Sequence, residues 1–498
     1  MKTLRIAALN YWPLLALSLI AGCTTEQAAP RPQQHTQAKN IILFIGDGMG
    51  VSTVTAARIL EGQLRGEPGE ENLLSFEHFP HVALVKTYNT NQQTPDSAGT
   101  MSAIMTGEKT RSGVISVNRH SKRNHCKGSQ DKSLQTFLEY AEQAGKATGI
   151  VTTTHLTHAT PAATFAHSPE RRWESDSEMP EMALQDGCKD IAVQLIEFPY
   201  GDGLEVALGG GRRYFMPNTQ TDPELTDRKG QRKDGRDLIH EWLSAGRSAY
   251  VWNQAQFKAL DLKTIDHLLG LFNYSHMQYE ADRSHDSAGE PSLTDMTAKA
   301  IDILEKNQHG YFLMVEGGRI DHAHHAGNAY RALTDTIEFS NAIATARNLT
   351  NADDTLILVT ADHSQVFTMA GYPTRGNPIL GKVISNDIFG EPESEPTLAR
   401  DGKPYTTLGY QNGAGFAVSN TSTLTSEYRA AVGGREQDLS TIDTENLNFH
   451  QQALVPLISE THGGEDVALY AEGPGASRVH GVMEQNVIFQ IMREAMGL

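Results

Sequence analysis

The feature that most constrains the fold is a set of short strand-like segments separated by stretches with helical periodicity. These segments occupy residues 40–45, 149–154, 205–210, 311–315 and 355–360; the first and the last two read N-I-I-L-F-I, Y-F-L-M-V and T-L-I-L-V-T. A strand that is buried on both faces has a continuous apolar run instead of an alternating pattern. The sequence therefore predicts an α/β fold, with a large, mostly parallel sheet and helices on both of its faces.

Three helices are predicted between these strands. Residues 132–145 and 328–349 have helical periodicity, and Ser292 with Asp295 three residues later forms a capping box that starts another helix. We expect this last helix to end at the pair His309-Gly310.

The N-terminus predicts export and not a folded domain. Residues 1–22 combine a basic start with an interrupted apolar stretch too short to span a membrane, which is typical of a signal peptide. I-A-G-C at residues 20–23 resembles a bacterial lipobox, which predicts a lipoprotein with lipid on Cys23; an ordinary signal peptide with a chance cysteine is the alternative. Residues 23–39 are polar and predict a flexible tether. Thr24 is not an acid, which favours the outer membrane.

Charge and composition narrow the partners and the architecture. The 42 basic and 60 acidic residues give a formal net charge of −18, which argues against nucleic acid as a partner. Any affinity for phosphate must then come from metal ions or a few well-placed cations. Between about residues 372 and 455 the periodic pattern weakens and Gly, Pro, Ser and Thr increase, which predicts an inserted subdomain.

Acidic and histidine residues follow three of the predicted strands. Asp47 follows the first strand, Glu316 follows strand 311–315, and the pair Asp362-His363 follows strand 355–360. Parallel strands place their carboxyl ends at one edge of the sheet, where sites form. Carboxylates that converge there repel one another unless a cation lies between them, so the pattern predicts a metal site.

The segment E-G-G-R-I-D-H-A-H-H, residues 316–325, adds further ligand types. Asp321 and His325 are four residues apart and would face the same way on a helix, which suits two ligands of one ion, whereas His322 and His324 cannot both join them. Mixed nitrogen and carboxylate ligands suit zinc, and carboxylate or hydroxyl oxygens suit magnesium. The alternative is a solvated polar start of a helix.

Ser97, in T-P-D-S-A-G-T-M-S-A-I-M (residues 94–105), is the candidate nucleophile. It follows Pro95 and opens a predicted helix, whose free N–H groups can bind an anion. The alternative is that Ser97 only caps the helix. No G-x-S-x-G motif is present, so a hydrolase triad is not indicated and the serine needs a metal to ionise it.

At these motifs the chain resembles the alkaline phosphatase family. The resemblance rests on five motifs, which are closer to the animal-type branch: N-I-I-L-F-I-G-D-G-M-G, T-P-D-S-A-G-T, V-E-G-G-R-I-D-H-A-H-H, V-T-A-D-H-S and E-T-H-G-G-E-D-V. The resemblance covers residues 40–498 and implies one catalytic domain that contains the inserted subdomain. It implies hydrolysis of phosphate monoesters through a phosphoserine, with two Zn²⁺ and one Mg²⁺ per chain.

The resemblance also implies the roles of individual residues. Ser97 matches the nucleophile, and Arg171 matches the arginine that binds phosphate, although Arg172 is adjacent. His158 matches a histidine near magnesium, and His322 one near phosphate. The implied ligand sets are Asp321, His325 and His462 for one zinc, Asp47, Asp362 and His363 for the second, and Asp47, Thr160 and Glu316 for magnesium.

Further expectations concern pairing, assembly and a fourth metal. Export makes a disulfide between Cys126 and Cys188 plausible, and both match a disulfide of the animal-type enzymes. The resemblance implies a homodimer, although the N-terminal helix that supports the animal dimers is replaced here by the short tether. A calcium site is doubtful: Glu224 and Phe272 match its pattern, but Asn273 and Ser284 stand where acids are expected.

Three rival functions can be compared with the sequence, and each of them fits it less well than a phosphatase. A phosphodiesterase of the same superfamily usually lacks the magnesium site, which Thr160 and Glu316 would form here. A sulfatase requires a C/S-x-P-x-R pattern, which Ser97-Ala98-Gly99-Thr100 does not match. A lipid-anchored phosphate-binding protein would not need both a nucleophile and a complete ligand set.

Overall fold

The computed structural model describes residues 37–244, 246–415 and 435–498. The chain separates into two units, Met1–His35 and Thr36–Leu498, and every described residue belongs to the second. The predicted signal peptide, Cys23 and all but the end of the predicted tether lie outside the described residues. Within the described part, no helix combines the length and the apolar character needed to cross a membrane.

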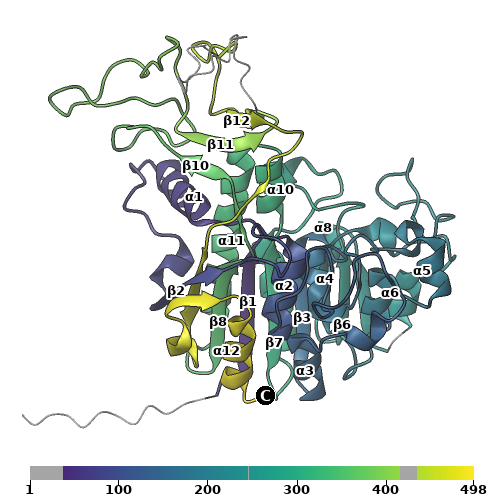
Figure 1. Ribbon diagram of the computed structural model, residues 1–498. Coiled ribbons are helices and arrows are strands. Elements are labelled where there is room, and N and C mark those ends of the chain that lie inside the picture. Colours follow the sequence, from purple (N-terminus) through teal and green to yellow (C-terminus); the bar gives the residue numbers. More distant parts are fainter. Residues whose placement is uncertain (1–36, 245, 416–434) are drawn as a thin grey trace, which may run out of the picture. The chain divides into compact units, whose positions relative to one another are not determined.

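A ten-stranded sheet forms the centre of the described residues, in the order β15-β2-β14-β8-β1-β7-β3-β4-β6-β5 (Figure 1). The central strands are β8 (Thr355–Ala361), β1 (Asn40–Gly46), β7 (Tyr311–Gly317) and β3 (Ala147–His155). One side continues with β4 (Val206–Gly210), β6 (His267–Leu271) and β5 (Ser248–Val251), and the other with β14 (Val467–Glu472), β2 (His81–Lys86) and β15 (Gly481–Glu484). Only β14 pairs antiparallel with its neighbours, so the predicted mostly parallel sheet is confirmed.

The register of the central strands determines where the candidate site residues begin. Gly46 at the end of β1 pairs with Gly317 of β7 and with Ala361 of β8. Because the three strands end in line, the residues that follow them start from the same edge of the sheet.

Two groups of helices pack beside the large sheet and on one another (Figure 1). One group consists of α1 (Val51–Leu64), α9 (Leu293–Leu304), α10 (Arg319–His325) and α11 (Ala329–Leu349). The other group consists of α2 (Ser97–Thr106), α3 (Phe137–Gln143), α4 (Ala159–Phe165) and α12 (Val487–Met496). The remaining helices, nearer β4–β6, are α5 (Glu181–Gln185), α6 (Ile191–Ile196), α7 (Leu238–Leu243) and α8 (Gln254–Ala259).

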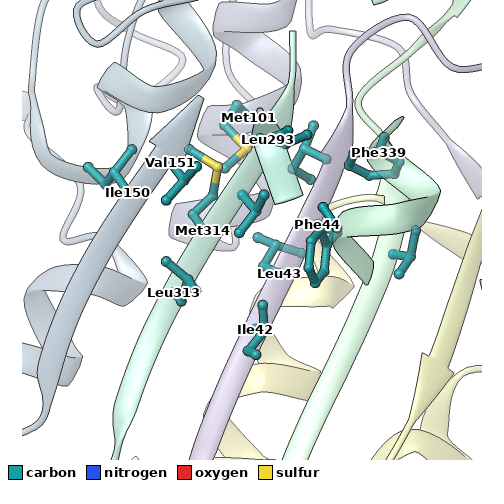
Figure 2. Packing of buried hydrophobic residues seen from close by; sticks show 14 of the residues in the cluster. Ile42, Leu43, Phe44, Met101, Ile150, Val151, Leu293, Leu313, Met314 and Phe339 are labelled. Carbon is teal, nitrogen blue, oxygen red and sulfur yellow. The ribbon is translucent and has the colours of Figure 1, made fainter. Parts of the chain in front are cut away.

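Apolar side chains on both faces of the central strands form the core (Figure 2). Phe44 of β1 meets Phe339 of α11 edge to face, with 5.8 Å between ring centroids, and Met314 of β7 lies beside Met101 of α2. All four are fully buried. Burying one such side chain stabilises the fold by about 1.5–3 kcal/mol, so this packing holds the strand ends in place.

Two helix boundaries differ from the prediction. The helix expected at 132–145 begins at Phe137, because Thr136 accepts a hydrogen bond from the Glu139 N–H and Glu139 accepts one from the Thr136 N–H, which forms a capping box. The capping box of Ser292 and Asp295 is confirmed, but α9 ends at Leu304, not at His309-Gly310. Gly310 has a φ of +92° and turns the chain into β7 instead.

Residues around the predicted insertion form a separate small sheet. β10 (Phe367–Met369), β11 (Leu408–Gly413) and β12 (Ala453–Pro456) make three strands of their own (Figure 1). Two further short strands, β9 (Ser364–Gln365) and β13 (His462–Gly463), pair close to the strand ends. The latter pair carries His462 to the same edge of the large sheet as Asp362.

Candidate metal centre and active site

The structure brings the acids and histidines predicted from separate strand ends into one cluster. Ligand atoms that lie within 4.8 Å of one another form three groups there, which are Asp321, His363 and His462; Asp47, Asp362 and His363; and Asp47, His158 and Glu316. Asp47, Asp362, His363 and Glu316 are completely buried. The strand register and the β9–β13 pair therefore place side chains more than 400 residues apart in the sequence in one site.

His325 and His462 mark the accessible end of this cluster. The Nδ1 atom of His325 lies 2.7 Å from the backbone oxygen of Glu460, and that of His462 lies 2.8 Å from the backbone oxygen of Pro95. A carbonyl oxygen only accepts, so each Nδ1 carries a proton and a metal ion would bind at each Nε2. Burial lowers the pKa of His325, but Asp321 and Glu460 raise it overall to about 9, so a metal ion would displace a proton from its Nε2. These two Nε2 atoms lie 3.1 Å apart, and Asp321 Oδ1 is 3.3 and 3.6 Å from them. Two nitrogen lone pairs and a carboxylate that face one another fit a cation, and mixed ligands suit zinc.

His363 has the same arrangement beside Ser97. Its Nδ1 lies 3.3 Å from the backbone oxygen of Ser364, and its Nε2 lies 3.3 Å from Asp362 Oδ2 and 3.5 Å from Asp47 Oδ1. The Ser97 hydroxyl oxygen is 3.1 Å from the same Nε2. A second cation held by these ligands would therefore contact a serine hydroxyl.

An oxygen-rich third group lies at the ends of β1 and β7. Thr160 Oγ1 is 3.4 Å from Asp47 Oδ2, whereas Asp47 Oδ1, Glu316 Oε1 and His158 Nδ1 are buried without any hydrogen-bond partner in the described residues. Buried polar atoms are almost always partnered, so orphaned ligand atoms point to an ion. Carboxylate and hydroxyl oxygens suit magnesium.

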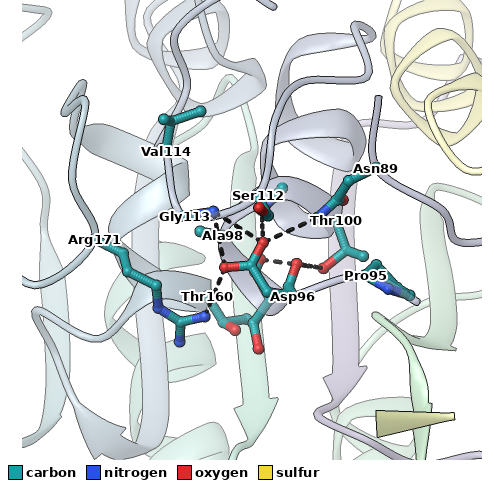
Figure 3. A network of polar contacts seen from close by, with 12 residues as sticks. Asn89, Pro95, Asp96, Ala98, Thr100, Ser112, Gly113, Val114, Thr160 and Arg171 are labelled. Atoms are coloured by element: carbon teal, nitrogen blue, oxygen red, sulfur yellow. Dashed lines mark hydrogen bonds and ion pairs between the residues drawn. The ribbon is translucent and has the colours of Figure 1, made fainter. Parts of the chain in front are cut away.

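Asp96 positions the helix that carries Ser97 (Figure 3). It is the N-cap of α2 and accepts a hydrogen bond from the Gly99 N–H, so Ser97 is the first helical residue and the alternative that Ser97 only caps the helix is wrong. Asp96 also accepts from the Gly113 N–H and from Arg171 Nη1 at 3.0 Å. Burial would raise the pKa of Asp96, but Arg171 and these N–H groups lower it overall, so the carboxylate stays ionised.

Only one of the two adjacent arginines faces the cluster. Arg171 is held by Asp96, and its Nη2 lies 3.4 Å from His158 Nε2. Arg172 is exposed, and its backbone N–H donates to Glu170. The ring of His322 lies 5.5 Å from that of His158. The structure therefore groups Arg171, His158 and His322, and leaves Arg172 outside.

Threonines that were not singled out from the sequence orient the buried acids. Thr152 and Thr154 of β3 donate to Glu316 Oε2, which leaves Oε1 free for an ion. Thr100 of α2 donates to Asp362 Oδ2 at 3.2 Å, and the Gly48 N–H donates to Asp362 Oδ1 at 3.1 Å. Such threonines carry no recognisable pattern in the sequence, because only the pairing of strands shows which carboxylate each one meets.

Without an ion, three buried acids of the cluster, Asp47, Asp362 and Glu316, hold protons more strongly than ordinary carboxyl groups. Burial raises the pKa of Asp47 well above its usual value, and Asp362, Asp321 and Glu316 raise it further. Burial likewise raises the pKa values of Asp362 and Glu316. A divalent cation removes this penalty because it stabilises the ionised forms.

Two other predicted features lie outside the cluster. The disulfide between Cys126 and Cys188 is confirmed, with 5.8 Å between the Cα atoms. Around Glu224, an arginine supplies the positive charge, since Arg212 Nη2 lies 3.0 Å from Glu224 Oε2. Ser284 is exposed, and the acid that contacts Asn273 is the buried Glu290, whose Oε1 accepts from Asn273 Nδ2 at 2.7 Å. We therefore propose no calcium at this place.

The sheet and the cluster define an α/β enzyme with candidate binding sites for several divalent cations. A family model for alkaline phosphatase matches residues 38–498. The chain belongs to the alkaline phosphatase family.

Curated relatives and solved structures agree with this assignment. The chain is 48% identical over 467 residues to the tissue-nonspecific alkaline phosphatase of Gallus gallus, which covers 92% of this chain and 84% of that protein. It is 47% identical over 466 residues to the tissue-nonspecific isozyme of Homo sapiens, covering 92% and 83%. The expected likeness to the animal-type branch is therefore confirmed. The alkaline phosphatase of Thermus thermophilus shares the fold, with a TM-score of 0.63 at 24% identity over 94% of this chain and 96% of that one.

Proposed function

We propose that this chain hydrolyses phosphate monoesters to an alcohol and inorganic phosphate through a covalent phosphoserine on Ser97. The observation that carries the proposal is the position of the Ser97 hydroxyl, which starts α2 and lies 3.1 Å from His363 Nε2 inside the cluster of ligand atoms. The family membership supports a metal-dependent phosphomonoesterase, and alkaline phosphatases use zinc and magnesium.

Three ligand sets within the cluster, chosen by the match to the family, are each proposed to hold one ion. The proposed sets are Asp321, His325 and His462 for one zinc; Asp47, Asp362 and His363 for the second zinc; and Asp47, Thr160 and Glu316 for magnesium. When bound, these cations supply positive charge that ionises the serine hydroxyl and water and stabilises the leaving oxygen.

The residues of the chain supply position and recognition. The oxygen of Ser97 forms a bond to phosphorus while the ester bond breaks on the opposite side, and the departing alkoxide takes a proton to become the alcohol. Water then breaks the Ser97–phosphate bond, which releases phosphate and restores the hydroxyl. Arg171, kept in place by Asp96, presents its remaining donors to two phosphate oxygens, with His158 and His322 beside it.

The accessible end of the cluster favours a broad choice of alcohols. The side chains of His325 and His462 are 30% and 16% exposed, whereas those of Asp47 and His363 are fully buried. The leaving group therefore points towards solvent while the phosphate is enclosed. The main rival is a phosphodiesterase, and the orphaned oxygens of Asp47 and Glu316, which suit a magnesium site, favour the monoesterase.

Cell location and assembly are proposed on other observations. We propose that residues 1–22 direct export, that lipid on Cys23 anchors the enzyme to the outer membrane, and that residues 23–39 connect it to the catalytic domain. The confirmed disulfide supports an oxidising compartment. We also propose a homodimer, supported by large exposed apolar side chains around the predicted insertion, which include Tyr372, Ile388, Phe389 and Ile458.

The test compares Ser97→Ala with Ser102→Ala, which changes the same helix outside the cluster. We expect Ser97→Ala to lower turnover of an aryl phosphate monoester by at least roughly 1000-fold, while zinc and magnesium contents stay near normal. Ser102→Ala should lower the melting temperature, because its hydroxyl bonds to Ala98 and Ser116, but keep turnover. Full activity of Ser97→Ala would contradict the covalent route, and faster cleavage of a diester than of the monoester would support the rival.

A further inference from the structure

Three imidazole rings meet beside Arg171. His276, which follows β6, lies 4.4 Å from His322 and 5.6 Å from His158 between ring centroids, and His158 lies 5.5 Å from His322. All three contacts are edge to face. His276 therefore touches both histidines that the proposed function places near phosphate, although no motif drew attention to it.

His276 is fixed to the end of β3. Its ring stacks on that of His155 with 3.6 Å between centroids and 5° between planes, and its Nδ1 accepts the His155 backbone N–H at 3.2 Å. His155 is itself held on both nitrogens, by Glu174 Oε2 at 2.9 Å and by Ser275 Oγ at 3.1 Å. The ring of His276 is thus held by a contact with the sheet and not by its own loop alone.

His322 has much weaker attachment of its own. Its Nδ1 accepts a hydrogen bond from Arg319 Nη1 at 2.9 Å, three residues away on the same helix, and no second hydrogen bond to the His322 ring is present among the described residues. The remaining support of its ring comes from the edge-to-face contacts with His276 and His158. Such a contact contributes about 0.5–1.5 kcal/mol beyond burial.

We propose that His276 is a positioning residue for phosphate binding. Its ring is fixed against His155 at the end of β3, and by packing against the His322 ring it holds that ring in the orientation that binds phosphate. This inference rests on the proposed function, because it takes His322 to lie beside the phosphate. His276 acts through the ring contact, and its hydrogen bond with the His155 N–H fixes its own orientation.

Two substitutions separate the ring contact from the hydrogen bond. His276→Phe keeps an aromatic ring but loses the acceptor for the His155 N–H, whereas His276→Asn keeps an acceptor but loses the ring. We expect His276→Asn to raise both KM and the inhibition constant of inorganic phosphate roughly three- to tenfold, the value of one lost ring contact, with a smaller change in kcat. His276→Phe should keep the inhibition constant and instead lower the melting temperature, because a buried N–H is left unpaired.

A double-mutant cycle tests whether the effect passes through His322. We expect His276→Asn combined with His322→Ala to bind inorganic phosphate no more weakly than His322→Ala alone. His267→Ala is the matched control, since His267 is a half-buried histidine at the opposite end of β6 that meets Trp242 edge to face, and it should leave phosphate binding unchanged.

Additive effects in the cycle, or weakened phosphate binding in His276→Phe equal to that in His276→Asn, would overturn the positioning role. Zinc and magnesium contents should stay normal in every variant, and loss of either ion in His276→Asn would also overturn it. An inactive Ser97→Ala together with unchanged phosphate binding in His276→Asn would remove only this inference, whereas an active Ser97→Ala would remove the proposed function.

Discussion

Two clusters of acidic side chains in the described residues have similar spacing between their ligand atoms, but their negative charge is neutralised differently. In the active-site cluster and in the group Asp176, Asp190 and Asp234, carboxylate atoms lie within 4.8 Å of one another. In the second group Arg232 is fully buried between the acids, with Nη2 3.0 Å from Asp190 Oδ2 and 3.9 Å from Asp176 Oδ1. In the first, Asp47 and Glu316 keep oxygen atoms without a partner. A candidate ion site therefore differs from an acid cluster neutralised by arginine in having buried ligand atoms without a partner, and not in the number of its acids.

A third group of acids is balanced in another way again. Glu142 and Glu205 are packed near the start of β3, where Glu142 accepts from Thr148 Oγ1 and Glu205 accepts from the Thr148 N–H. Burial, together with Glu205, raises the pKa of Glu142 to about 9, and burial raises the pKa of Glu205 to about 8. This pair is kept neutral by protons. Each of these three ways of neutralising buried acids can be altered separately by a substitution or by removal of metal ions.

Removing metal ions should have the largest effect. Treatment with a chelator should lower phosphomonoesterase activity by roughly 1000-fold or more, since several kcal/mol of transition-state stabilisation are lost. The melting temperature should fall as well, because the ions bind only the folded state. Activity, measured by release of phosphate, should return with zinc plus magnesium. If the activity did not change with the chelator, the active-site cluster would not depend on ions, and the contrast with the second cluster would be wrong.

Arg232→Met should convert the second cluster into one that resembles the first. Loss of a buried charge partner should lower the free energy of unfolding by about 3–5 kcal/mol, because three acids are left unbalanced. Calcium should then raise the melting temperature of the variant more than that of the wild type. Arg228→Met, at an arginine whose side chain is 61% exposed, is the control and should change neither quantity. A calcium response equal to that of the wild type would count against the charge argument.

Glu142→Gln should change the pH dependence of stability. The folded-state pKa is raised above the unfolded value near 4.5, so the stabilising contribution of the proton is complete below pH 4.5 and is lost as pH rises towards 9. The amide cannot ionise, so from pH 7 to 9 the variant should lose less stability than the wild type, by on the order of 2 kcal/mol. Urea unfolding at both pH values measures this, and parallel losses would show that Glu142 is already ionised at pH 7.

Thr100→Val should have the smallest effect. It removes the hydroxyl that donates to Asp362 Oδ2 and keeps the shape of the side chain. We expect zinc retention to weaken about fivefold, which corresponds to a hydrogen bond of about 1 kcal/mol. Competition with a chelator measures it. Thr106→Val is the control, because its hydroxyl bonds only to the backbone of Ser102 and Glu108, away from the cluster; an equal loss in both variants would indicate a general change in the helix.

The fold followed largely from local patterns. The strands expected at 40–45, 311–315 and 355–360 correspond to β1, β7 and β8. A strand made only of apolar residues is stable mainly in a sheet that is covered on both faces. The start of α3 was misplaced by five residues, since the capping box of Thr136 and Glu139 was not recognised. The end of α9 was misplaced because Gly310 was taken as the stop signal, although the apolar pattern already ends at Leu304 and residues 305–309 are all polar.

The site was only partly accessible from sequence. Residues in long motifs, such as Asp321 and His325, could be named because their spacing and chemistry are visible in one segment. Asp96 and His276 could not, because their importance lies in contacts with Arg171 and His322, which belong to other segments. Nothing in the sequence around His276 indicates that it stacks on His155.

The sequence by itself determined the kinds of group available, namely acids and histidines directly after buried strands and a serine at the start of a helix. Only the tertiary structure decided which of them meet. His462 reaches the backbone oxygen of Pro95, 367 residues away, because β13 pairs with β9 after the end of β8. The physical reason is that hydrophobicity selects strands locally, whereas strand register and side-chain packing over long separations set the distances on which metal binding and catalysis depend.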